Sequence, residues 1–224
     1  NLKISDIPSD ESIIKIANDF VFKYNINTKN YGKPEIVNDW KQYYEQSEDK
    51  NNYYIPNSIG VIYPLIINGK QVYESYGGKV GMTVNVDVLS KKVDSLYGIQ
   101  TQNYESSKYD LETDSNKLLE IIKIGGEVFY PRYSLESNAK EISSNVKNPS
   151  IAYMRTYKYN NNTSFELYIP AMILDIENAI NNNYRKNIVI PLTKDSIEEI
   201  LKNNKEQQVI DPAIEIQPLM KTVK

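Results

Sequence analysis

The pattern of hydrophobic positions predicts a helix near the start of the chain. Ile13, Ala17 and Phe20 recur at the spacing of one helix face. Ser9 lies where an N-cap residue belongs, because its hydroxyl can accept a hydrogen bond from a free amide of the first turn. We therefore predict a helix over about residues 10–25.

Strand patterns follow this helix over the rest of the first hundred residues. Residues 36–46 are rich in aromatic side chains and predict a strand. The pair Asn68-Gly69 is a strong hairpin signal, because both positions tolerate a positive φ. We therefore expect Ile59–Thr101 to form a continuous antiparallel meander, with the helix packed across one face through its apolar positions.

Alternation of apolar and polar residues is clearest over Val80–Val88. Val84 and Val86 share one side of this predicted strand, while Asn85 and Asp87 share the other. The apolar side is expected to be buried against the helix. The polar side is expected to face solvent, as in many antiparallel sheets.

The second half of the chain repeats the order of a helix followed by strands. Its pattern predicts a helix over 114–124, strands over 151–159 and 165–176, a short strand over 186–192 and a last helix over 194–204. No residue identity at a fixed period accompanies this order, so the repeat is one of pattern only.

Together these elements predict an α+β fold built on an antiparallel meander, with helices packed on one face and the order of helix then strands occurring twice. The length of 224 residues suits one large domain or two small ones. We expect residues 1–103 to form a helix-plus-meander half. Residues 104–224 are expected to form a helix-plus-hairpin half with a C-terminal helix, packed on the first half as one unit.

Composition narrows the possible functions. The chain has no Cys and no His, which excludes thiol nucleophiles, thiolate metal sites and histidine general bases. The net charge of −3 lacks the basic excess of a nucleic-acid binder. Apolar stretches such as Gly60–Ile67 are shorter than the roughly 20 residues of a membrane helix. We expect no enzyme, no cofactor, no nucleic-acid partner and no membrane insertion by this segment, with any anchor outside it.

Three carboxylates, Asp110, Glu112 and Asp114, occupy alternate positions before the second predicted helix. An extended loop would direct them to one side, as calcium-binding loops do. The glycine and the final glutamate of such a loop are missing, since Ile121 stands where that glutamate belongs. A solvated loop that caps the helix is the alternative, and it is the one that we expect.

Aromatic side chains are concentrated in the first half and form a candidate binding surface. The residues of this surface are Trp40, Tyr43, Tyr44, Tyr63, Tyr73 and Tyr76. Tyrosine is common where proteins bind glycans or peptides, but it also fits the packed face of a sheet. Both interpretations stay open on the sequence alone.

Acidic pairs offer the remaining route to catalysis. Glycoside hydrolysis needs two carboxyl groups about 5–10 Å apart. Glu198 with Glu199, or Glu35 with Asp39, could supply such a pair. Nothing in the sequence brings particular acids together, so a carboxylate-dependent hydrolase is only an alternative.

Residues 9–100 resemble the PepSY family of bacterial envelope domains. The helix Glu11–Ala17, the strand ending Val84–Val88 and the following Lys92-Val93 are similar to the helix and final strands of that family. The chain departs from the family at its final turn, where Ser90–Lys92 stands in place of a glycine. The repeated order is also similar to envelope regulators of the YycH and YycI type, and to uncharacterised cell-surface proteins of small-genome bacteria.

This resemblance implies an anchored ectodomain that binds proteins or modulates a peptidase, with no catalytic residues to assign. We therefore expect a non-catalytic, extracytoplasmic binding or regulatory ectodomain of a bacterial cell-surface protein, with a protein or cell-envelope component as partner. One alternative is a glycan- or peptide-binding module that uses a tyrosine-rich sheet face. The second alternative is the carboxylate-dependent hydrolase.

Overall fold

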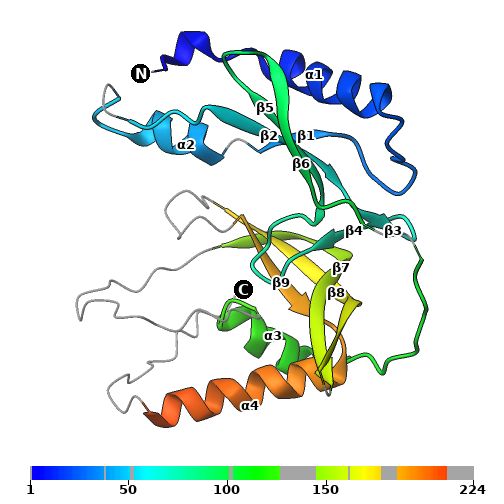
Figure 1. The fold of residues 1–224 in the computed structure, drawn as a ribbon. Helices are drawn as coiled ribbons and strands as arrows, with labels where there is room; N and C mark the ends of the chain where they lie inside the picture. The colour runs from blue at the N-terminus through cyan, green and yellow to red at the C-terminus, as the bar shows by residue number, and fades with distance from the viewer. Residues whose placement is uncertain are drawn as a thin grey trace.

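The fold is α+β, as the sequence predicts, and it contains two sheets (Figure 1). The computed structural model describes residues 2–37, 39–50, 53–100, 103–126, 145–160, 162–177 and 186–210. From top to bottom of Figure 1, helix α1, the first sheet, the second sheet and helices α3 and α4 lie in layers. Along the part of the chain so described, no helix is both long and apolar enough to cross a membrane.

The first sheet is antiparallel throughout, with strand order β1-β2-β5-β6. Its strands are β1 (Glu35–Val37), β2 (Ser58–Pro64), β5 (Gly81–Asp87) and β6 (Lys92–Tyr97). Helix α1 (Asp10–Lys23) packs on one face, and Ser9 caps it by accepting a hydrogen bond from the amide of Ser12. This confirms the first predicted helix.

The core beneath α1 is apolar. Ile13 and Ala17 of the helix are buried against Val84 and Val86 of β5, which are fully buried. Val21 completes the buried helix face, while the predicted Phe20 is only partly buried at its edge. The alternation along β5 is confirmed at Asn85 and Asp87, which are partly exposed, whereas Thr83 on the same side of the strand is buried.

The second sheet has strand order β3-β4-β7-β8-β9. Its strands are β3 (Ile66–Ile67), β4 (Lys70–Tyr73), β7 (Val146–Asn160), β8 (Thr163–Ile176) and β9 (Asn187–Pro191). All neighbours are antiparallel except β4 and β7, which are parallel. Helices α3 (Ser115–Lys123) and α4 (Lys194–Ile210) pack on this sheet through a core that includes Ile121 and Ile197.

The predicted continuous meander is wrong in one respect. The Asn68-Gly69 turn forms the expected hairpin, but its strands β3 and β4 join the second sheet, so β2 pairs directly with β5. Pro64 and Gly81 are paired where the chain crosses between the sheets. A Cβ on Gly81 would lie 2.2 Å from the Tyr63 carbonyl oxygen, so only glycine fits there. The predicted division at residue 103 therefore does not coincide with the division into sheets.

The predicted strand over 36–46 is also wrong. Only Glu35–Val37 is extended, and α2 (Asp39–Gln46) follows it. The aromatic residues favoured a strand by propensity, yet Trp40 and Tyr44 are four residues apart, which is a helical spacing. A short 3-10 helix, η1 (Ile4–Asp6), precedes α1.

Candidate binding cleft between the two sheets

A cleft of about 580 Å³ lies where the two sheets meet. The lining on the first sheet includes one residue from each strand that lies on the face opposite to α1. These residues form a single row across the sheet: Glu35, Ile62, Thr83 and Tyr97. The other side consists of the turn that follows β4, together with Arg155 of β7 and the start of β9.

The turn after β4 is closed by its own backbone hydrogen bonds and lies against β9. The amide of Glu74 donates to the Gly78 carbonyl at 2.8 Å, and the amide of Gly77 donates to the Glu74 carbonyl at 2.9 Å. Gly77 has a φ of +95°, and a Cβ on it would lie 2.7 Å from the Asn187 carbonyl oxygen. Glycine is required here, because any side chain would push the turn away from β9 and widen the cleft.

Ion pairs cross and border the cleft. Lys79 Nζ lies 2.5 Å from Glu35 Oε2, which ties the turn to the edge strand β1. Arg155 lies between two carboxylates: it pairs with Glu74, and its Nη1 lies 3.3 Å from Glu166 Oε1. Burial acts against the charge of Arg155, but the hydrogen bond and charge of Glu74 outweigh it and raise the arginine pKa. Arg155 is therefore a permanent cation at this position.

A series of hydrogen bonds continues from the Arg155 ion pairs to Gln100, which follows β6. Tyr168 donates its hydroxyl to Glu166 at 2.7 Å, and burial followed by this hydrogen bond raises the pKa of Tyr168. The Tyr168 hydroxyl also lies 3.3 Å from Oε1 of the Gln100 side chain, and the backbone amide of Gln100 donates to the Tyr31 hydroxyl at 3.0 Å. These contacts join β8 to Gln100, which follows β6, and to Tyr31 in the loop that follows α1.

The six aromatic residues of the predicted binding surface do not share one face. Tyr63 is only 4% exposed in the core under α1, donates to Asn18 at 2.8 Å, and has its pKa raised to about 12 by burial. Tyr73 packs in the second sheet and donates to Gln71 at 2.8 Å, and its pKa is raised, mainly by burial. Tyr76 is the member of the predicted binding surface that the structure places in the lining of the cleft.

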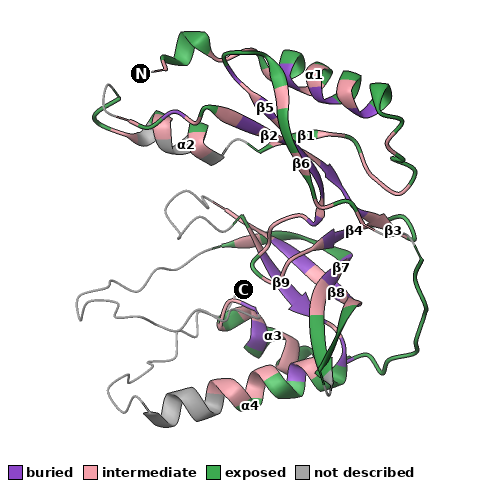
Figure 2. Ribbon diagram, viewed as in Figure 1, coloured by how far each residue is buried: buried purple, intermediate pink, exposed green. Residues whose placement is uncertain are grey.

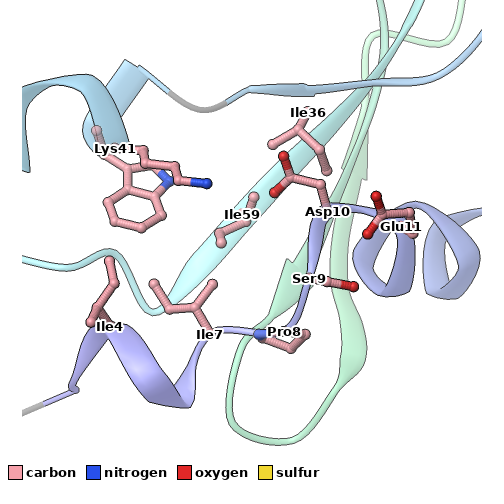
Figure 3. Close-up of a pocket in the computed structure, with 10 residues that line it drawn as sticks. Ile4, Ile7, Pro8, Ser9, Asp10, Glu11, Ile36, Lys41 and Ile59 are labelled. Atoms are coloured by element: carbon pink, nitrogen blue, oxygen red, sulfur yellow. The ribbon is translucent and has the colours of Figure 1, made fainter. Parts of the chain in front are cut away.

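The other members lie on α2, away from the cleft. Trp40 packs against the first core, and Tyr44 makes an edge contact with Tyr53 at 5.8 Å between ring centroids. Tyr43 is in the same helix, but its side chain lies outside the described part of the structure. Trp40 also lines a smaller pocket of about 350 Å³ at the start of α1, where Figure 3 shows Ile4 and Ile7 beside the sheet.

The carboxylates before α3 form a helix cap. Asp114 is the N-cap and accepts from the Asn116 amide at 2.9 Å, which confirms the predicted cap. Glu112 was expected to be solvated, but it is buried. Its carboxylate accepts hydrogen bonds from two backbone amides and from Lys117 Nζ at 2.8 Å. The Lys117 bond, then that from the Asp114 amide, lowers the pKa of Glu112 to about 2.

Asp110 contributes to the contact between this loop and the start of α4 through its backbone. Its carbonyl accepts from the Lys194 amide at 3.0 Å, and the neighbouring residue Leu111 bridges to Thr193. Within the described ranges, no group of three or more acidic, His or Cys side chains is placed to hold a metal ion. The lack of metal binding at these three positions stays a prediction.

The rarity of arginine in the sequence could have indicated one residue of the cleft. Arg155 is one of only three arginines in a chain with 23 lysines, and it lies in a tyrosine-rich strand. A single Arg at such a position suggests a fixed pairing with carboxylates, because its planar fork holds two of them better than Lys would. Its partners Glu74 and Glu166 could not be identified without the register of the strands.

Comparisons with known proteins leave the family of this chain open. A scan against protein-family models found no match, and searches of curated proteins and of solved structures found no significant similarity. Function is therefore inferred from the residues and geometry of the chain.

Proposed function

We propose that the chain is a non-catalytic binding or regulatory module of a bacterial cell-surface protein, and that its partner binds in the cleft between the two sheets. The location outside the cytoplasm is proposed from the resemblance to the PepSY family alone. The partner is proposed to be a protein or another cell-envelope component.

The observation that supports this proposal is the composition of the cleft. Tyr76 and Tyr97 line it from opposite sheets and are 54% and 57% exposed. Exposed tyrosines favour recognition, because each ring offers apolar area together with a polar hydroxyl. The charged groups beside them, Glu35 with Lys79 and Glu74 with Arg155, are neutralised in pairs.

The pairing of charges favours binding over hydrolysis. Glu35 of the first acidic pair considered above forms an ion pair with Lys79, and the Asp39 side chain lies outside the described residues. Glu198 and Glu199 are exposed on α4 and do not line the cleft. A hydrolase needs two acids facing a common substrate, and the two acids that the structure places in the lining of the cleft, Glu35 and Glu74, are each paired with a cation.

A capture experiment with a matched control tests the proposal. The immobilised protein is exposed to bacterial envelope extract, and captured components are compared for wild type, the double variant Tyr76→Ala with Tyr97→Ala, and Tyr54→Ala. Tyr54 is 73% exposed and does not line the cleft, so its replacement controls for the loss of a surface tyrosine. We expect a component that wild type and Tyr54→Ala capture and that the double variant loses.

Two results would contradict the proposal. Equal capture by all three proteins would place the binding site elsewhere. Turnover of a glycan, peptide or ester substrate that is abolished by replacing Glu35 or Glu74 with the matching amide would instead support the hydrolase.

A further inference from the structure

The hairpin β7–β8 extends well beyond the rest of the second sheet. The last pair between β4 and β7 is Tyr73 with Met154, and β9 pairs with β8 only from Ala171 onward. Beyond these points β7 and β8 continue as two strands, residues 155–160 and 163–169, named here the distal ribbon. Among the residues that the structure places, no third strand pairs with it.

The outer part of the distal ribbon is exposed on both faces. Residues 157–159 and 163–166 are all exposed, and this part of the hairpin is green in Figure 2. Three of these residues are aromatic: Tyr157, Tyr159 and Phe165 are 46%, 81% and 52% exposed. An isolated two-stranded ribbon is marginally stable in water, so a further strand along its edge would stabilise it.

The edge of the distal ribbon carries the charged residues Arg155 and Lys158, but it lacks a bulge and a proline, two features that prevent strand pairing. On the first sheet, edge strand β6 carries a register shift opposite Asn85 and Val86, which disrupts its ladder. The register of β7 with β8 is regular from residue 150 to residue 160, and the β7 segment 155–160 contains no proline. Its edge is therefore open to pairing, whereas the β6 edge is not.

We propose that two copies of the chain associate by pairing the β7 edges of their distal ribbons, antiparallel about a two-fold axis at Tyr157. The two ribbons then form one four-stranded sheet, and the contact closes on itself as a dimer. The observations that support this association do not depend on partner binding in the cleft, although Arg155 borders both surfaces.

The side chains select this register. With the axis at Tyr157, Arg155 faces Tyr159 of the second copy, and Lys158 faces Thr156 of the second copy. Arg155 already lies 5.7 Å from the ring centroid of Tyr157, so its guanidinium is placed near aromatic rings. An axis at Lys158 would instead oppose two lysines, which is unfavourable in an antiparallel pair.

Charge variants at the axis test the proposal. The molar mass of the full chain is measured by light scattering after size exclusion, over a series of concentrations. We expect a concentration-dependent dimer for wild type. Tyr157→Lys and Tyr157→Glu, each alone, should weaken dimerisation about tenfold or more, because the axis opposes like charges. Mixing the two variants should restore the dimer, since Lys then faces Glu.

The control is Phe165→Glu, which adds the same charge as Tyr157→Glu to a similarly exposed aromatic position on β8, opposite Lys158 of the same ribbon, and should leave the dimer intact. Far-ultraviolet circular dichroism checks that each variant is folded. A wild type that is monomeric at every concentration overturns the proposal. So does a mixture of the two Tyr157 variants that stays monomeric, or a Phe165→Glu variant that loses the dimer as Tyr157→Glu does.

Discussion

The face of the first sheet under α1 and the distal ribbon of the second sheet use tyrosine and charge in opposite ways. In the first sheet Tyr63 is buried under α1 beside fully buried valines, and the stabilising contacts there are mainly apolar. In the second sheet Tyr159 is exposed, and Arg155 joins neighbouring strands through carboxylates. The comparison teaches that tyrosine content alone does not identify a binding surface, because position in the sheet decides whether a ring packs or is exposed.

The largest expected effect breaks the apolar core of the first sheet. Val84→Asp should destabilise the protein by about 3–5 kcal/mol, because it buries an unpaired charge under α1. Asn85→Ala, one position along the same strand, removes a hydrogen bond to Ser95 on the open face and should cost about 0.5 kcal/mol. Denaturant unfolding measures both, and similar losses for the two variants would contradict the assignment of the buried face.

The next effect concerns the ion pairs of the second sheet. Arg155→Ala should cost about 2 kcal/mol, between the values for exposed and buried pairs, because it leaves Glu74 and Glu166 without their cation. Lys147→Ala removes a more exposed pair with Glu177 and should cost less than about 1 kcal/mol. If Arg155→Ala unfolds at the same denaturant concentration as wild type, the charge network does not stabilise the second sheet.

A smaller effect depends on pH and involves the cap of α3. The pKa of Glu112 is about 2 in the folded protein, against 4.5 for an ordinary glutamate. The stabilisation from its bonds is therefore fully present above about pH 4.5 and is lost as the pH falls towards 2. Unfolding of wild type and Glu112→Gln should differ most near pH 7, and the difference should shrink over this window. A constant difference would contradict the cap.

The last prediction is that calcium does not change the thermal stability of the protein. Asp110, Glu112 and Asp114 should not bind calcium, since Glu112 is occupied by Lys117 and Asp114 by the helix amide. A ligand at 100 times its Kd would add about 2.7 kcal/mol. Thermal unfolding in calcium and in chelator should therefore give the same melting temperature, and a clear rise with calcium would contradict this.

Local patterns predicted the elements better than their partners. Helix α1, the β5 alternation and the β7–β8 hairpin follow from residue spacing, because each is decided within a short window of the chain. The transfer of β3 and β4 to the second sheet could not be predicted, since it depends on the parallel pairing of Val72 with Tyr153. The α2 helix was missed because aromatic propensity outweighed helical spacing.

The candidate site was less predictable than the fold. Tyr76 was identified from composition, but Tyr97 and Arg155 lie in the cleft only because strands distant in sequence are neighbours. Glu112 shows the same limit, since its burial depends on the backbone contact with Leu192. Chemistry assembled from several strands requires the register of each strand, which spacing within one strand does not provide.

Photo-crosslinking from inside the cleft tests the central claim most directly. A photoreactive phenylalanine analogue replaces Tyr97 in the cleft or, as the control, Tyr54 outside it, and each protein is irradiated in the presence of bacterial envelope extract. We expect a discrete crosslinked product from position 97 that is absent at position 54. No product from position 97, or the same product from both positions, would contradict the assignment of the cleft as the binding site.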